Sequence, residues 1–115
     1  MQAHERFRFH LCSELVSVTR LSSRRLLQAV DGNLEEIGEE RALILMQDAV
    51  PAGTRVRVKV KAHELKGFVS SCTFDQLLGF FIEIKLDAES RWSESLFLPQ
   101  HQLALCMQHP AGLIW

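Results

Sequence analysis

The sequence of 115 residues lacks the features of nucleic-acid-binding, membrane-spanning and secreted proteins. Its formal net charge is −1, whereas proteins that bind DNA or RNA through the phosphate backbone carry a strong basic excess. No apolar run approaches the roughly 20 residues that cross a bilayer, and residues 1–8 carry charge in place of an apolar signal-peptide core. We therefore expect a cytoplasmic protein that has no membrane span and binds neither DNA nor RNA.

Metal-binding and catalytic motifs are also missing. The three cysteines, Cys12, Cys72 and Cys106, show no C-x-x-C spacing, so neither a disulfide framework nor a zinc site is predicted. The acidic residues between positions 35 and 40 fit a solvated turn better than a metal site, which would need three or more converging oxygens. The sequence contains no G-x-S-x-G, H-E-x-x-H or Gly-rich phosphate loop. We expect no resident metal, no cofactor and no enzymatic activity.

The composition that remains is that of an ordinary globular domain. Hydrophobic residues make up 47% of the chain and charged residues 23%, and the length suits one domain with one core. No repeat, linker or low-complexity segment divides the sequence. We predict a single domain over residues 1–115, with a barrel over about 6–86 and a helical, apolar tail over about 87–115.

Alternating apolar and polar residues predict a series of short strands. The clearest strand covers residues 54–61, where Val56, Val58 and Val60 alternate with arginines and lysines that face water. Alternation predicts further strands over residues 6–11, 14–19, 67–73 and 80–86, and short apolar runs predict strands over 26–30 and 42–46.

Glycine, proline and acidic residues predict the connections. Asp31-Gly32-Asn33 is typical of a tight turn, so we expect either a hairpin there or a bulge within a longer strand. The acidic group at 35–40 is expected to form a turn around Gly38, because glycine weakens a helix. Pro51-Ala52-Gly53 predicts a reverse turn, since proline fixes φ and glycine permits positive φ.

After Asp87 the apolar period changes from that of a strand to that of a helix. Asp87 is a typical N-cap residue, Trp92 and Leu96 would share one helix face, and Pro99 would end the helical segment. Many short strands and then one short C-terminal helix predict an all-β barrel or sandwich with a helical appendage.

Residues 34–44 resemble the second signature of PilZ domains, in which Asp or Asn, any residue, Ser, any two residues and Gly precede small and apolar residues. The turn at 50–54, the strand entry at 64–69 and the last barrel strand at 79–84 occur in the order of that family. The likeness covers about residues 6–101. It implies a six-stranded antiparallel β-barrel and, because many PilZ domains bind the bacterial second messenger cyclic di-GMP, a regulatory role in bacterial signalling.

The resemblance also implies which residues would hold the nucleotide. In the family an Arg-x-x-x-Arg motif before the barrel clamps guanine and phosphate, a task that suits the planar fork of arginine. At the required spacing the sequence has Gln2 with Arg6 and His4 with Arg8, so each pair contains only one arginine. Arg6 and Arg8 are equally consistent with the solvated face of an edge strand. In the ungapped frame Glu36 takes the Asp/Asn position, Gly38 the Ser position and Arg41 the Gly position.

Departures from the family pattern weaken this expected site. Gly38 lacks a hydroxyl, and Arg41 brings a side chain that would cost about 1–2 kcal/mol if its position requires positive φ. Glu39 and Glu40 add negative charge beside a dianionic ligand. Each lost charged contact costs about 1.5–3 kcal/mol, so we expect cyclic di-GMP to bind weakly or not at all. A substitute clamp of Arg6, Arg8 and Arg41 would reverse that expectation.

Two other alignments and a second function stay open. Residues 20–24 also read Arg-x-x-x-Arg but lie between predicted strands, and a frame shifted to Asn33, Glu35 and Gly38 recovers the Asn and the Gly. A barrel without its nucleotide would be a scaffold for protein interaction, so a protein partner is expected. Trp115 and the apolar tail around it would dock onto the barrel or onto that partner.

Overall fold

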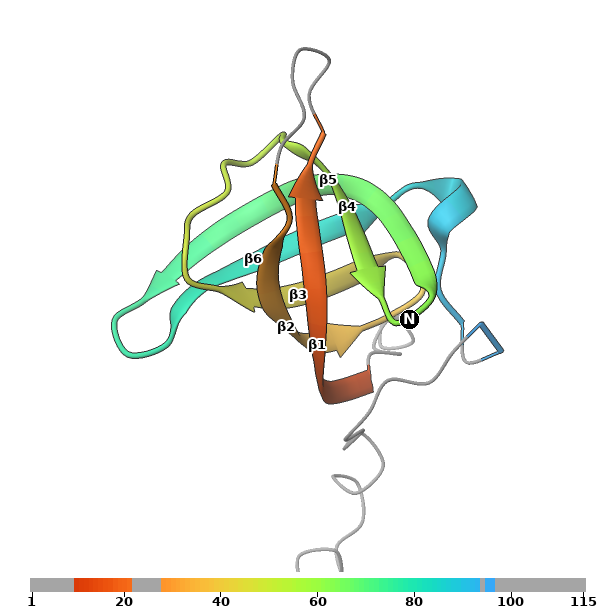
Figure 1. Cartoon of the computed structure of the whole chain (residues 1–115), viewed down its shortest axis with the longest axis horizontal. Helices are drawn as coiled ribbons and strands as arrows, with labels where there is room; N and C mark the ends of the chain where they lie inside the picture. Colours follow the sequence, from red (N-terminus) through yellow and green to blue (C-terminus); the bar gives the residue numbers. More distant parts are fainter. Residues whose placement is uncertain (1–9, 22–27, 94, 97–115) are drawn as a thin grey trace, which may run out of the picture.

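Six antiparallel strands close into a barrel (Figure 1). The computed structural model describes residues 10–21, 28–93 and 95–96. Around the barrel the order is β1-β2-β3-β6-β5-β4, and β4 pairs with β1 to close the cylinder. This confirms the predicted all-β, six-stranded antiparallel barrel. The strands are β1 (His10–Arg20), β2 (Val30–Ile37), β3 (Arg41–Met46), β4 (Arg55–Val60), β5 (His63–Asp75) and β6 (Gly79–Leu86).

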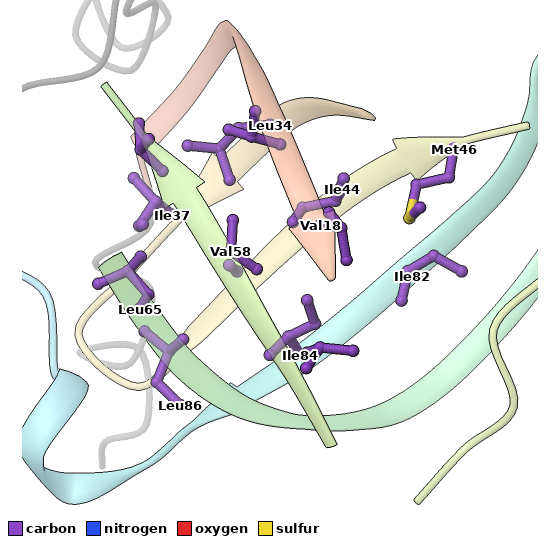
Figure 2. Packing of buried hydrophobic residues seen from close by; sticks show 14 of the residues in the cluster. Val18, Leu34, Ile37, Ile44, Met46, Val58, Leu65, Ile82, Ile84 and Leu86 are labelled. Atoms are coloured by element: carbon purple, nitrogen blue, oxygen red, sulfur yellow. The ribbon is translucent and has the colours of Figure 1, made fainter. Parts of the chain in front are cut away.

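The inward side of each strand fills the barrel. On β4 the three predicted valines are fully buried, and Ile82 and Ile84 of β6 are equally inaccessible. Figure 2 shows aliphatic side chains from all six strands meeting in this interior. The alternation seen in the sequence therefore has the expected cause, because every second side chain points into one apolar core.

Close approach of β5 to β6 requires glycine at position 67. Gly67 pairs with Val56 of β4 and Leu86 of β6. A Cβ at this position would overlap the carbonyl oxygen of Lys85 and lie 2.9 Å from its carbonyl carbon. The absence of a side chain lets the two strands pass each other at this corner of the barrel.

The predicted turn at Asp31-Gly32-Asn33 is wrong, because all three residues lie within β2 and pair with β1. Gly32 faces the barrel interior, where a Cβ would lie 2.7 Å from Cγ2 of Ile44. Glycine is therefore required here by packing against Ile44 and not by a turn. The alternative, a bulge within a longer strand, is closer to the structure, although the register shift falls between Leu34 and Glu36 on the side of β3.

Two other strand boundaries differ from the prediction. The segments 6–11 and 14–19 were expected as separate strands, but residues 10–20 form the single strand β1, with a register shift between Leu11 and Glu14. β5 runs from His63 to Asp75 and is longer at both ends than the predicted strand 67–73. Residues 6–9, 26 and 27 lie outside the described residues. The rest of the predicted strand 26–30 is wrong for residues 28 and 29, which are not in a strand, whereas Val30 begins β2.

The helix expected after Asp87 is a single 3-10 turn, η2 (Ala88–Ser90). The Asp87 side chain does not cap it and instead accepts two hydrogen bonds from Arg55, at 3.0 and 2.6 Å. No helix in the described part of the chain is long and apolar enough to cross a membrane. The predicted tail beyond residue 96 lies outside the described residues.

Trp92 and Leu96 do not share a helix face, so that prediction is wrong. The chain is not helical at Trp92, which is 3% exposed and packs its ring 5.0 Å from that of His10. Leu96 is 40% exposed. Burial of the large indole at the end of the barrel stabilises a non-helical chain here, and this outweighs the local helical pattern.

Candidate functional site

Three of the five predicted ligand residues lie together where β2 turns into β3. Glu36 is near the end of β2, Gly38 comes just after β2, and Arg41 begins β3. The N–H of Gly38 donates to the carbonyl oxygen of Arg41 at 2.8 Å and closes the turn. Arg6 and Arg8 lie outside the described residues, so the predicted arginine clamp is not tested.

Next to this turn the barrel wall has an open hollow of about 210 Å³. Glu36 of β2, Leu43 of β3 and Glu83 of β6 stand in one row across three neighbouring strands. Arg41 and Ala42 complete the lining. The hollow thus contains two of the predicted residues, Glu36 and Arg41, together with one carboxylate that was not predicted.

The unpredicted residue, Glu83, holds the Arg41 guanidinium. Nη1 of Arg41 lies 2.6 Å from Oε2 of Glu83. The other carboxylate oxygen of Glu83 accepts a hydrogen bond from Ser70 at 3.1 Å and one from Ser71 at 3.4 Å. The carboxylate is therefore held from two strands, and a second ligand for Arg41 would have to compete with an anion already in place.

Glu36 adds further negative charge to the hollow. Partial burial raises the pKa of its carboxyl, the positive charge of Arg41 opposes that shift, and the nearby Glu35 and Glu83 reinforce it. When both lining carboxyls are ionised, they outnumber the single lining guanidinium. Binding of an anion in the hollow is consequently disfavoured, whereas binding of a neutral or cationic group is not.

The backbone strain expected at Arg41 does not arise. Arg41 is in the extended conformation of β3, and Lys61, with φ of 57°, is the one non-glycine residue of positive φ in the described ranges. The arginine in the position of the family glycine therefore costs no strain of this kind. Its effect on a ligand would come from its volume and from its pairing with Glu83.

The acidic group is divided between a strand and a turn. Glu35 and Glu36 belong to β2, so the prediction that they lie in the turn is wrong, whereas Glu39 and Glu40 are exposed in it as expected. Arg91 offsets part of the negative charge of the turn, at 3.5 Å from Glu39 and 2.6 Å from Glu40. Within the described ranges no group of three or more His, Cys, Asp or Glu residues is placed to hold a metal ion.

The same turn is bonded to the segment that leaves the barrel. The N–H of Trp92 donates to the carbonyl oxygen of Glu39 at 3.1 Å, and the N–H of Leu86 donates to that of Glu40 at 2.8 Å. The β2–β3 turn, which borders the hollow, is thus hydrogen-bonded to the chain on both sides of η2.

Cys12 is a structural residue. It is buried on β1, and its thiol donates to the carbonyl oxygen of Leu34 at 3.5 Å. Burial raises its pKa to about 12, with smaller contributions from Glu14, Glu35 and Glu36. Because the thiolate is the reactive form, a buried thiol with a raised pKa is a poor nucleophile.

Sequence reasoning missed Glu83, Ser70 and Ser71. The alternation of β6 does place Glu83 on the outer face, opposite the buried isoleucines. The sequence did not show, however, that β6 would lie beside β3, because these strands are far apart in the chain and the order of strands decides the pairing.

Comparison of the chain with protein-family models, with curated proteins and with solved structures finds no match. The barrel and the hollow between β2, β3 and β6 therefore carry the functional proposal.

Proposed function

We propose that the protein is a PilZ-like regulatory domain of cyclic di-GMP signalling whose nucleotide site has degenerated. It binds the nucleotide weakly or not at all and acts through contact with another protein. The closed six-stranded antiparallel barrel supports the likeness to PilZ domains, as does the position of Glu36, Gly38 and Arg41 at one turn. The single observation that carries the proposed loss of nucleotide affinity is the ion pair between Arg41 and Glu83.

The ion pair sets the electrostatics that a nucleotide would meet. A phosphate or guanine that used Arg41 would have to displace the Glu83 carboxylate, which stays in the hollow with Glu36. Two unit charges about 4 Å apart interact by about 1 kcal/mol in water and about 4 kcal/mol near a protein surface. Two like-charged neighbours are therefore enough to offset one charged contact of about 1.5–3 kcal/mol.

Isothermal titration calorimetry with cyclic di-GMP tests this proposal. With nucleotide up to about 1 mM, we expect no heat or a dissociation constant above about 100 µM. Glu83→Gln removes the competing charge and should tighten any binding that uses Arg41 by about tenfold. Glu64→Gln is the matched control, because Glu64 faces Arg57 at 3.6 Å on the β4–β5 side and does not line the hollow.

Two results of this titration would contradict the proposal. Micromolar binding by the unchanged protein would overturn the proposed loss of affinity. Equal effects of the Glu83 and Glu64 variants would show that the hollow is not the nucleotide site, and GTP in place of cyclic di-GMP controls for nonspecific nucleotide heat.

A second candidate function is that of a protein-interaction scaffold unrelated to nucleotide. The observation that favours it is the tip of the β5–β6 hairpin, where Phe74 is 61% exposed and Leu77 90% exposed. Large apolar side chains presented together on a surface are typical of a docking site. Complete absence of binding in the Glu83→Gln variant at about 1 mM nucleotide would favour this function over the first.

A further inference from the structure

β5 extends beyond the strand that pairs with it on one side. β4 covers β5 only from His63 to Phe68. Val69 then exchanges backbone hydrogen bonds with the preceding loop, accepting from Gly53 at 2.7 Å and donating to Thr54 at 2.9 Å. On its other side β5 stays paired with β6 as far as Asp75. Residues 70–75 therefore have a strand on one side and, among the described residues, no backbone partner on the other.

This stretch, which we call the β5 edge (residues 70–75), has few of the features that prevent strands from pairing. An open edge presents alternate N–H and C=O groups to another chain, and natural proteins usually block it with lysine, proline or a strong bulge. The β5 edge reads Ser-Ser-Cys-Thr-Phe-Asp, without lysine or proline. Its one irregularity is the register shift between Val69 and Ser71, at the start of the stretch.

The edge is held in place by its hairpin. Oδ1 of Asp75 accepts hydrogen bonds from the N–H groups of Leu77 and Leu78, at 2.9 and 3.0 Å. The side-chain amide of Gln47 donates to the carbonyl oxygen of Leu78 at 3.1 Å. These bonds order the loop and turn the Asp75 carboxylate toward the backbone, so residues 70–74 form an ordered and uncharged strand. Figure 1 shows this hairpin projecting from the barrel.

We propose that the β5 edge pairs antiparallel with the β5 edge of a second copy of this chain and joins two barrels into a two-fold dimer. A two-fold axis places identical stretches opposite each other, and like charges facing each other would be repelled. Residues 70–74 carry no charge, and Thr73 is exposed. When the axis passes at Thr73, the two copies of Thr73 face each other, and a cross-strand pair of threonines is favourable. Ser71 then faces Asp75 of the second copy, so no like charges are opposite each other.

The apolar tip of the hairpin fits the same occupant. Antiparallel pairing about Thr73 brings Leu77 level with residue 69 of the second copy. Beside Val69 lies the turn of Pro51, Ala52 and Gly53, which is exposed and uncharged. A second copy therefore supplies both backbone partners for the edge and an apolar contact for Leu77. The hairpin itself, residues 74–80, has no lysine or arginine that would attract an anionic membrane.

β1 offers a weaker alternative edge. β4 pairs with β1 only from Ser17 to Arg20, so the first part of β1 has no β4 neighbour. That part, however, contains the buried Glu14, and the ammonium of Lys61 lies 4.0 Å from its carboxylate. A charge over the edge opposes self-pairing there.

The test is self-association of the whole protein without nucleotide, measured by analytical ultracentrifugation between about 10 µM and about 1 mM. We expect the average mass to rise from the monomer toward twice that value. Thr73→Lys puts like charges opposite each other on the edge and should raise the dissociation constant at least about tenfold. Ser13→Lys adds the same charge to the exposed face of β1 and should leave association unchanged.

Amide hydrogen exchange gives a second readout that needs no variant. Exchange of residues 70–75 should slow as protein concentration rises, while exchange of the paired strand β4 should not change. The proposal is overturned if the unchanged protein is monomeric at about 1 mM, if Thr73→Lys associates as well as the parent, or if Ser13→Lys alone abolishes association. Because no nucleotide is present, these outcomes are independent of the proposed cyclic di-GMP site.

Discussion

Replacing Gly67 by alanine should disrupt closure of the barrel, because the backbones of β5 and β6 are in contact at this position. The new methyl group would overlap the carbonyl oxygen of Lys85 and lie 3.0 Å from Cα of Leu86. Both neighbours are main-chain atoms in a paired strand. No side-chain rotation can therefore relieve the overlap, and the strands have to separate.

The expected loss is large for a single methyl group. Overpacking in a filled core costs typically about 1–3 kcal/mol and occasionally more. Gly67 belongs in the upper part of that range, because separation also weakens its pairing with Val56 on β4. We expect Gly67→Ala to lower the free energy of unfolding by about 3 kcal/mol or more.

Gly53→Ala is the matched control. Gly53 has a φ of 92°, and a Cβ there would meet no atom within 4 Å. Alanine at this position costs conformational strain of about 1–2 kcal/mol without steric overlap. The pair of variants therefore separates the clash from the loss of glycine flexibility.

Equilibrium unfolding in urea measures both losses. With a slope of about 1–3 kcal/mol per molar urea, the Gly67 variant should move the midpoint by about 1 M or more, and the Gly53 variant by clearly less. Equal shifts for the two variants would contradict the close approach of β5 and β6. So would a Gly67 variant within about 1 kcal/mol of the parent.

Three further predictions concern a thiol, a carboxylate and an indole. Cys12, with its pKa near 12, should resist alkylation at pH 8 in the folded protein and be labelled in peptide maps only after denaturation. The hydrogen bond from Arg55 lowers the pKa of Asp87, so its contribution to stability is present above the ordinary carboxyl pKa and is lost as pH falls through the lowered value. Asp87→Asn should therefore flatten the acid end of a stability profile, and an unchanged profile would show that this pair does not contribute. Trp92→Ala should cost about 3–5 kcal/mol in thermal or urea unfolding, whereas a loss below about 1 kcal/mol would show that the indole does not close the barrel end.

Strands with a regular period were predictable because their pattern has one cause. On β4 each second residue is a valine that enters the core, and β6 repeats this with Ile82 and Ile84. Neither pattern depends on which strand lies beside it. The fold class could therefore be predicted from the sequence, together with the reverse turn before β4.

Features that depend on distant neighbours could not be predicted in the same way. Gly32 has the local sequence of a turn, yet the side chains of Ile44 and Met46 on the next strand explain the glycine. The segment around Trp92 has helical spacing, but the open end of the barrel buries the indole in a non-helical chain. In both cases tertiary packing overrides a local preference.

The candidate site was predictable in part for a related reason. Glu36 and Arg41 are close in sequence, so any turn between them brings them near each other. Glu83 comes from a strand about forty residues later, and its place beside Arg41 results from the crossing of the chain from β3 to β4. Only that crossing leaves β3 free to pair with β6.

The bonds between the β2–β3 turn and the chain around η2 have a mechanical consequence. Glu39 and Glu40 accept backbone hydrogen bonds from Trp92 and Leu86, and Arg91 holds both of their carboxylates. An outward shift of the turn would therefore either move the segment around η2 with it or break these bonds. A molecule bound in the hollow next to the turn could in this way displace the chain that follows the barrel.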